Sequence, residues 1–403
     1  MNAIRQVLTL GIVAAALCAC AKTSDTDTVS TAPAPSTVES APAVAPADAF
    51  VTTEVQKFNS PWAMTFLPDG RLLVTEMAGT LHVYDIASNK TGNVGGVPEV
   101  AHVAQGGLGD VVLHPQYATN RLIYISYVER GEGDLLGAAV ARAKLSLDDA
   151  GGGALEDLQV IWRQTPKKSG DGHFGYRIAF DGDGKLFISS SERKEFDPAQ
   201  DMATNLGKIV RLNDDGTPAE GNPFANQGGV TAQIWTLGHR NILGLAFDAN
   251  GQLWAHEMGP MGGDELNRIE KGANYGYPIV SNGDHYDGTV IPDHDTRTEF
   301  RAPVVSWNPV ISPAGFIIYS GDLFPAWKGN GFVGGLSSMS LVRVAFDGEG
   351  AHEAQRFDMQ RRIREVEQGP DGAIWLLEDG TRGADGWLLK LTPRQTRKSP
   401  WPG

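Results

Sequence analysis

A histidine in a glycine-rich stretch is the first candidate for chemistry. His173 stands two residues after Asp171 and four before Arg177. The imidazole titrates near neutral pH, so it can act as a general base. A lone histidine is more often a structural side chain, but the acidic and basic neighbours here favour a catalytic one. Glu192 and Arg193, which follow the next strand-like segment, are further polar candidates.

Three arginines form a second group of candidates. Arg240 is followed by Asn241, while Arg362 and Arg364 alternate within an apolar frame. Residues two apart on a strand point to the same side of a sheet. The guanidinium group is a planar fork that matches carboxylates, and asparagine adds a neutral donor and acceptor. Together these residues could hold an anionic ligand; the alternative is that they are ordinary surface arginines.

Acidic residues and glycines are concentrated between positions 256 and 278. This stretch contains Glu257, Asp264 and Glu265 among several glycines. Carboxylates and backbone carbonyls are the oxygen ligands that calcium takes. The spacing is not that of an EF-hand, so the pattern alone does not identify a metal.

One local pattern, repeated six times, predicts the scaffold that positions these residues. A turn carrying Asp-Gly or Asn-Gly (once Asn-Arg) precedes an apolar strand; the turns lie at 69–70, 120–121, 183–184, 250–251, 330–331 and 371–372. Asn, Asp and Gly accept the positive φ of such turns. Gaps of about forty to about eighty residues match four-stranded propeller blades with loop insertions. We predict an all-β fold, a six-bladed β-propeller of four-stranded antiparallel blades; unrelated hairpins in a sandwich are the alternative.

A propeller would gather the candidate residues. One strand of each blade lines the central channel, and loops at one end form a shared pocket. Glu192 and the run 257–260 directly follow two of the repeated strands. We therefore expect them to converge on the axis.

The N-terminal segment reads as an export signal and a tether. Residues 1–19 contain Arg5 and an apolar run too short to span a bilayer, so we predict a signal peptide. The run ends Leu17-Cys18-Ala19-Cys20, which resembles a bacterial lipobox with Cys20 as the acylated residue; a plain signal peptide is the alternative. Residues 20–49, rich in Ala, Pro, Ser and Thr, are predicted to be a disordered tether. We expect a propeller domain over 50–395, a tail over 396–403, and a periplasmic, lipid-anchored protein.

Composition narrows the classes of function. The 403 residues are 41% hydrophobic and 20% charged, which is typical of a folded protein. The formal net charge is -14, and an acidic surface repels phosphate backbones, so nucleic acid is not an expected partner. The two cysteines are Cys18, in the predicted leader, and Cys20, directly after it, so cleavage before Cys20 would leave the mature domain with no cysteine available for a disulfide.

Ordered motifs resemble the soluble aldose sugar and glucose dehydrogenases that depend on pyrroloquinoline quinone (PQQ). The matching segments run in order from about Phe58 to Leu391, nearly the whole predicted domain. They are Gln105–Leu108, His173–Arg177, Ala199–Asp201, Leu206–Arg211, Gly238–Asn241, Glu257–Glu265, Asn274–Pro278, Tyr319–Phe324 and Arg362–Arg364. The aldose sugar dehydrogenase branch is the most similar.

The resemblance implies catalytic and sugar-binding roles. His173 matches the base that takes the proton of the sugar's C1 hydroxyl while hydride passes to the quinone, and Arg240 is placed beside it in the catalytic group. Glu192 stands where the family usually has an aspartate that orients this histidine. Gln105 matches a residue of the sugar pocket, to which we also assign Asp171.

The resemblance also implies ligands for PQQ and calcium. The expected PQQ-binding residues are Arg240, Asn241, Arg362, Arg364 and Trp307. Backbone carbonyls of Gly259 and Pro260 match ligands of a calcium ion bound to the cofactor. Glu265 and Tyr275 match a second, structural calcium site.

Three positions depart from the family pattern. Ser337 occupies the position of a lysine that contacts the cofactor in the glucose dehydrogenases. Its replacement puts some cofactor affinity in doubt. Glu192 is one methylene longer than the usual aspartate, and Met258 replaces a polar side chain.

The expected activity is PQQ- and calcium-dependent oxidation of aldoses at C1 to the lactone. Without an attached haem motif, the electrons must pass to an external acceptor, whether a quinone, a cytochrome or a dye. A monomer and a homodimer are both compatible with the sequence. Two alternatives stay open: a calcium-dependent propeller lactonase, which would not need the arginines, and a non-catalytic binding propeller, which Ser337 favours.

Overall fold

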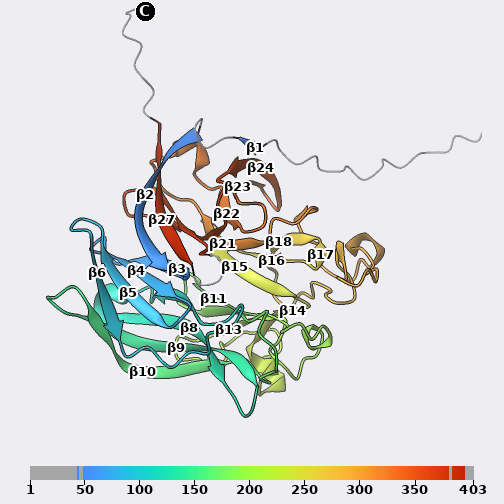
Figure 1. Ribbon diagram of the computed structural model, residues 1–403. Helices are drawn as coiled ribbons and strands as arrows, with labels where there is room; N and C mark the ends of the chain where they lie inside the picture. The colour runs from blue at the N-terminus through green and yellow to red at the C-terminus, as the bar shows by residue number, and fades with distance from the viewer. Residues whose placement is uncertain (1–42, 45–48, 381–383, 395–403) are drawn as a thin grey trace, which may run out of the picture. The chain divides into compact units, whose positions relative to one another are not determined.

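The computed structural model describes residues 43–44, 49–380 and 384–394, which are coloured in Figure 1. All of them belong to the unit Ser40–Gly403. The predicted signal peptide, Cys20, most of the tether and the tail lie outside the described residues. Of the tether, β1 (Ala43–Val44) pairs in parallel with β24 (Gly350–Asp358).

The first eight strands of the repeated pattern form two groups of four. In each group the neighbours are antiparallel and follow chain order. A parallel pairing of β6 with β10 joins the two groups into one eight-stranded sheet. The strands are β3 (Pro61–Phe66), β4 (Leu72–Glu76), β5 (Thr80–Asp85), β6 (Lys90–Gly95), β7 (Leu108–Leu113), β8 (Leu122–Arg130), β9 (Leu136–Leu147) and β10 (Gly153–Arg163).

Two further four-stranded sheets follow in the middle of the chain. One contains β11 (Gly175–Phe180), β12 (Leu186–Ser190), β13 (Lys208–Leu212) and β14 (Ile234–Leu237). The other contains β15 (Asn241–Phe247), β16 (Leu253–Met258), β18 (Asp264–Arg268) and β20 (Val305–Trp307). The short strands β17 (Met261–Gly262) and β19 (Gly283–Asp284) pair outside it.

The last two groups bring the ends of the described chain together. The fifth contains β21 (Pro313–Ile318), β22 (Gly331–Gly335), β23 (Ser340–Asp347) and β24, with β1 at its edge. The sixth contains β25 (Ile363–Gln368), β26 (Ile374–Glu378) and β27 (Asp385–Pro393). Its outer strand is β2 (Phe50–Asn59), which runs antiparallel to β27 (Figure 1).

The predicted turns mostly form where the sequence placed them. In five of the six turns the second turn residue has a positive φ angle; these residues are Gly70, Gly184, Gly251, Gly372 and the non-glycine Arg121. At Asn330-Gly331 the prediction is shifted: Gly331 already belongs to β22, and the positive φ falls on Gly329, at 81°. The predicted alternation is also weaker than expected, because β4 and β12 are buried at every residue. Apolar residues therefore occupy both faces.

The first strands of the six groups lie next to one another in sequence order. β3 contacts β7, and contacts continue through β11, β15, β21 and β25 back to β3. Apolar clusters span neighbouring groups; one joins Leu73, Ile125 and Ile188. Burial of each such side chain contributes about 1.5–3 kcal/mol. A cavity of about 120 Å³ lies where all six first strands meet, lined by polar residues that include Asp110, Arg177 and Glu365.

Strands therefore dominate the described chain, and the predicted all-β class is confirmed. The α2 helix (Tyr117–Asn120) is one short turn that precedes β8. None of the helices in residues 43–44, 49–380 and 384–394 has the length and apolar character needed to cross a membrane.

Candidate active site

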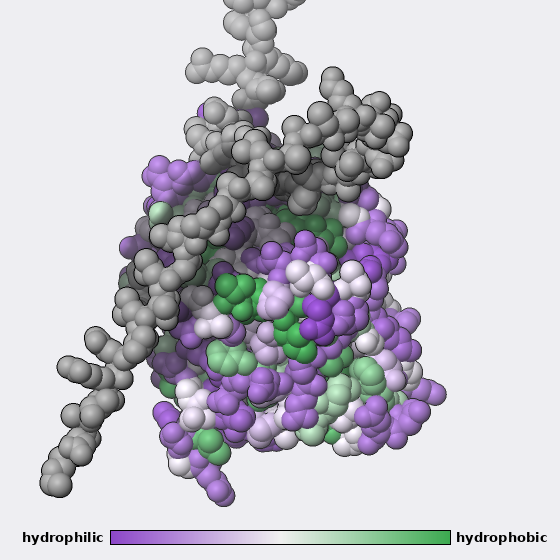
Figure 2. Space-filling model, turned by 90° about the vertical axis from the view of Figure 1, so that its right-hand side faces the viewer, coloured by the Kyte–Doolittle hydropathy of each residue, from purple (hydrophilic) through white to green (hydrophobic). Residues whose placement is uncertain are grey.

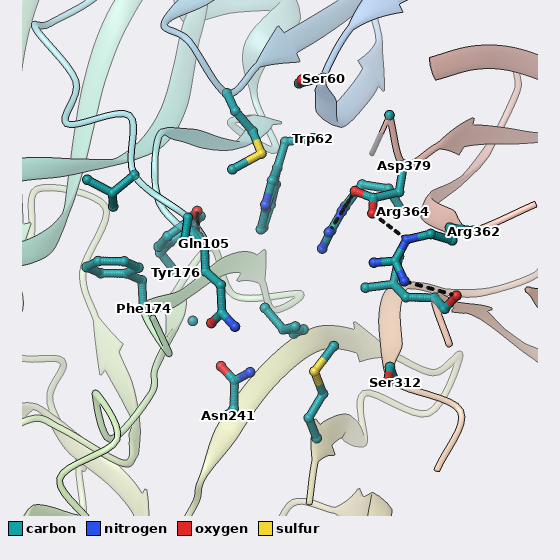
Figure 3. Close-up of a pocket in the computed structure, with 18 of the residues that line it drawn as sticks. Ser60, Trp62, Gln105, Phe174, Tyr176, Asn241, Ser312, Arg362, Arg364 and Asp379 are labelled. Carbon is teal, nitrogen blue, oxygen red and sulfur yellow. Dashed lines mark hydrogen bonds and ion pairs between the residues drawn. The ribbon is translucent and has the colours of Figure 1, made fainter. Parts of the chain in front are cut away.

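A cavity of about 990 Å³ lies at one end of the first strands. Neighbouring strands are antiparallel, so the start of each first strand and the end of each second strand meet at this end. Figure 3 shows side chains entering the cavity from several sheets. Four predicted site residues are among those that line it: Gln105, Asn241, Arg362 and Arg364. A cavity of this volume suits a ligand of cofactor size.

Arg362, directly before β25, and Arg364, within it, share one carboxylate in this cavity. Arg362 Nε lies 2.8 Å from Asp379 Oδ2, and Arg364 donates from Nε and Nη2 to Asp379 Oδ1 at 2.9 and 2.8 Å. Burial favours the neutral form of Asp379, but the two guanidinium groups outweigh it and lower its pKa. Two positive charges therefore face one negative charge. Asp379 was not among the predicted residues, although the β25–β26 hairpin places it opposite Arg362.

Arg240 is not part of the cavity lining. It is buried, and its Nη1 donates to the carbonyls of Met258 at 2.9 Å and Gly259 at 2.5 Å. Its Nε has no hydrogen-bond partner among the described residues. The guanidinium lies 5.8 Å from the ring centre of Tyr286, an exposed side chain. Of the three predicted arginines, Arg362 and Arg364 therefore line the cavity together, and Arg240 lies apart from them.

His173 and Glu192 form a buried pair. Imidazole Nδ1 contacts Glu192 Oε1, and the second carboxylate oxygen accepts the amide of Phe196 at 2.9 Å. The main-chain amide of His173 donates to Gln105 Oε1 at 2.9 Å. Gln105 and Phe174, which flank the histidine, both line the cavity. The extra methylene of Glu192 therefore does not prevent contact with the imidazole.

Protonation states follow from this geometry. Burial lowers the pKa of His173, and the hydrogen bond that its imidazole donates to Glu192 offsets this only in part. Burial pushes the pKa of Glu192 upward, but the hydrogen bond and charge of His173 outweigh that effect and the net pKa is lowered. At neutral pH a neutral imidazole thus faces a carboxylate. With Nδ1–H donating to Glu192, the tautomer leaves Nε2 able to accept a proton.

Two predicted residues lie elsewhere. Asp171 is exposed, 3.5 Å from Lys194 Nζ, although its carbonyl accepts the Gln105 amide at 3.0 Å. Trp307 is buried in an apolar cluster, and its Nε1 donates to Glu353 at 2.8 Å. Trp307 is absent from the described lining of the cavity, whereas Trp62 belongs to it.

Trp62 and Tyr176 supply aromatic surface that the sequence reasoning missed. Both line the cavity, and their ring centres are 5.0 Å apart (Figure 3). The buried Arg177 guanidinium lies 4.1 Å from the Trp62 ring and forms an ion pair with Glu365. Trp62 is the second residue of β3, the first strand of its group, a position from which the propeller hypothesis could have predicted it.

The residues predicted to bind calcium all belong to the fourth group, between the end of β16 and the start of β20. Glu265 is buried, and Asn267 Nδ2 bridges it to Glu257 at 3.1 and 3.2 Å. Burial, and then the charge of Glu257, raises the pKa of Glu265. The Tyr275 carbonyl accepts His294 Nε2 at 3.1 Å. No group of three His, Cys, Asp or Glu side chains suited to a metal occurs in the described chain.

The surface beside Arg240 mixes polar and apolar residues. Met261, Tyr286 and Val290 expose 53%, 74% and 73% of their surface. The β17–β19 segment lies to the right in Figure 1, on the side that faces the viewer in Figure 2. Figure 2 shows apolar patches among hydrophilic residues on that face.

Comparison with known proteins identifies the family. The sequence pattern of the Glucose / Sorbosone dehydrogenase family matches residues 58–390. The chain belongs to this family. The aldose sugar dehydrogenase YliI of Escherichia coli is 38% identical over 365 residues, which cover 89% of this chain and 96% of that protein. These comparisons confirm the family resemblance that was inferred from the motifs. They also confirm the predicted enzyme class, an oxidoreductase of the sugar dehydrogenase type.

Solved structures of other family members have the same fold. The apo-form of the soluble aldose sugar dehydrogenase from Escherichia coli superposes with a TM-score of 0.81 at 37% identity and covers 86% of this chain and 100% of that one. The PQQ-bound form of aldose sugar dehydrogenase from Streptomyces coelicolor gives a TM-score of 0.70 at 28% identity, with 85% and 98% coverage. This architecture therefore also occurs in an aldose sugar dehydrogenase that was solved with PQQ bound.

Proposed function

We propose that this protein oxidises aldose sugars at C1 to the lactone with bound PQQ and calcium. The observation that carries the proposal is the buried His173–Glu192 pair beside a cavity that contains two arginines. A base is needed to remove the hydroxyl proton, and cations are needed to hold an anionic quinone. The two arginines line the cavity, and His173 adjoins it through Gln105 and Phe174, which line it as well.

The cavity fits a flat tricarboxylate. Arg362 and Arg364 retain donors beyond those that Asp379 uses, and buried Asn241 Oδ1 has no hydrogen-bond partner in the described chain. Trp62 and Tyr176 offer ring faces against which a planar molecule can pack. When bound, PQQ would supply the hydride acceptor. Roles for Arg240 and Trp307 in binding PQQ stay predictions.

His173 would take the proton of the C1 hydroxyl. Its imidazole is neutral at pH 7 because burial lowers its pKa, and Nδ1–H donates to Glu192. Nε2 can then accept the proton, and the Glu192 carboxylate stabilises the imidazolium that results. Gln105 connects this pair to the cavity, and we propose that it also contacts the sugar, with Asp171 at the outer edge.

Calcium would be held largely by main-chain oxygens. We propose the Gly259 and Pro260 carbonyls for the ion beside the cofactor, where it would polarise a quinone oxygen as a Lewis acid. The Gly259 carbonyl accepts Arg240 Nη1, so Arg240 would have to turn away when calcium binds. Glu265 and the Tyr275 carbonyl fit a second ion, since a cation there would offset the buried charge of Glu257 and Glu265.

The architecture that holds this site is, in our proposal, a six-bladed propeller over residues 50–395. The support is six groups of four strands whose first strands contact one another in a closed series. Pairing of β2 with β27 would close the last blade. An external electron acceptor is also part of the proposal, because electrons must leave the reduced cofactor.

Reconstitution tests the function directly. Purified protein is given PQQ and calcium, and dye-linked oxidation of glucose is measured together with the cofactor spectrum. The expected result is sugar-dependent dye reduction that requires both additions. His173→Ala should abolish turnover and retain PQQ binding. A folded wild-type protein that reduces no dye would refute the proposal, and lactone hydrolysis without PQQ would favour the lactonase alternative.

A further inference from the structure

The backbone around His173 has an unusual conformation. Residues 164–174, between β10 and β11, belong to no strand. Gly170 and His173 have φ angles of 89° and 52°, and Tyr176 follows with 59°. Each non-glycine residue in the left-handed region costs about 1–3 kcal/mol and persists only when its surroundings hold it. The segment that carries the proposed base therefore needs support from outside itself.

Arg193 provides that support through three main-chain carbonyls. Its Nε donates to Gly172 at 2.9 Å, Nη2 to Gly170 at 2.7 Å and Nη1 to Leu136 at 2.6 Å. Two of these carbonyls belong to the residues just before His173. The third belongs to the first residue of β9, so the guanidinium links the segment to a neighbouring strand.

The ring of Phe174 completes the contact. The Arg193 guanidinium lies 4.0 Å from its ring centre, and only 2% of Arg193 is exposed. No carboxylate of the described chain lies within ion-pair distance of Arg193, so the guanidinium interacts with carbonyl oxygens and an aromatic ring instead. Burial lowers its pKa to about 10, which still leaves it protonated at neutral pH. The buried guanidinium of Arg193 therefore holds the main chain next to His173 in place.

Arg193 and Glu192 act on the same histidine from consecutive positions. Glu192 contacts the imidazole, whereas Arg193, with φ of 64°, turns toward the backbone on the other side. Arg193 reaches its three carbonyls from three separate nitrogens of one planar fork, whereas a lysine ammonium offers all its donors from a single point. Both residues follow the end of β12, so one short turn holds the side chain and the main chain of His173.

We propose that Arg193 is a positioning residue for the sugar-oxidising base. Its guanidinium fixes the main chain before His173 and the ring after it, so that the imidazole keeps its contact with Glu192. The inference rests on the proposed function of His173. It predicts that loss of the fork impairs proton removal and leaves cofactor and sugar binding largely intact.

The test compares Arg193→Met and Arg193→Lys with the matched control Arg211→Met. Arg211 also lies over a ring, 5.1 Å from the centre of Trp235, and donates to a carbonyl, that of Glu220 at 3.1 Å, but contacts no residue of the cavity in these interactions. Thermal unfolding of all three variants measures the purely structural loss. Kinetics with glucose and titration with PQQ then separate kcat, KM and cofactor affinity.

For Arg193→Met we expect kcat to fall about 100-fold, as for a base misplaced by about 1 Å, while KM and the PQQ dissociation constant stay within about twofold. The proton resonance of His173 Nδ1–H, shifted downfield by Glu192, should be lost or moved in both Arg193 variants and unchanged in Arg211→Met. Wild-type kcat with an unmoved resonance in a folded Arg193 variant would overturn the proposal.

Two arms keep the result decisive. If Arg193→Met does not fold, Arg193→Lys, which retains the charge and the aliphatic stem, gives the same readouts, and a wild-type resonance in it refutes the role. If wild-type protein oxidises no sugar, the proposed function fails on its own. The resonance of His173 then still reports whether Arg193 positions the imidazole.

Discussion

Replacement of Glu192 by glutamine is the sharpest test of the proposed base. The two carboxylate oxygens of Glu192 accept two donors, His173 Nδ1 and the Phe196 amide. A glutamine side chain has one acceptor oxygen and one NH₂ donor. In either orientation, one of the two present donors, His173 Nδ1–H or the Phe196 amide, loses its acceptor. If the oxygen faces the Phe196 amide, the NH₂ donates to Nδ1 and leaves the proton on Nε2, which removes the base.

The expected loss follows from the burial of the pair. Glu192 has no exposed surface and His173 exposes 7%, so solvent does not screen the contact. A hydrogen bond to a charged group contributes about 1.5–3 kcal/mol, and each 1.36 kcal/mol is tenfold in rate, so kcat should fall about 10- to 150-fold. Glu192 raises the pKa of His173, so its removal should move the acid limb of the kcat/KM profile to lower pH.

Steady-state kinetics of the PQQ-loaded protein from acidic to neutral pH measures both effects. Glu192→Asp keeps the charge and should lose less activity. Glu195→Gln, in the same turn and paired at the surface with Lys168, is the matched control and should behave as wild type. A Glu192→Gln variant with wild-type kcat and an unmoved acid limb would refute the reasoning.

Three further outcomes are expected. Arg364→Met should raise the PQQ dissociation constant about tenfold or more. Arg361, whose side chain pairs with Glu54 and Glu378, provides the control, and Arg361→Met should leave that constant unchanged. Equal effects of the two substitutions in a PQQ titration would contradict the assignment of Arg364 to the cofactor cavity. Calcium at 100 times its dissociation constant should stabilise the protein by about 2.7 kcal/mol. This stabilisation should appear as a higher Tm that EDTA reverses. Glu265→Gln should reduce the calcium-dependent increase in Tm, and an undiminished increase in that variant would exclude Glu265 as a ligand. Burial raises the pKa of Glu367 from its ordinary value of 4.5 to about 8, so the folded state holds the extra proton and its stability falls as pH rises between these values. Glu367→Gln should therefore raise Tm at pH 9 and have little effect at pH 5, and a Tm difference independent of pH would contradict this.

Residues that meet across a single hairpin were within reach of the sequence. β11 and β12 pair Gly175 with Ser190, and continuing that register by two residues places His173 opposite Glu192. In the same way the pairing of Ile363 with Glu378 places Arg362 opposite Asp379. Asp379 was nonetheless missed, because the pattern of alternating arginines drew attention to one strand and not to its partner.

Residues that depend on contacts between sheets were not within reach. Trp307 pairs with Asp264 across a connection of about forty residues, and that register decides that its ring lies in the core. Trp62 faces the cavity because the first strands of different groups lie side by side.

The sequence by itself determined the repeating hairpins, the strand-rich class and the family, because turn chemistry and apolar strands act between residues close along the chain. Tertiary structure alone decided which polar side chains share the cavity and which tryptophan borders it. It also brought Arg193 against three carbonyls from two distant segments. These contacts join segments that are far apart in sequence. Their geometry is set by the packing of whole sheets against one another, and such packing has no local sequence pattern from which it could be predicted.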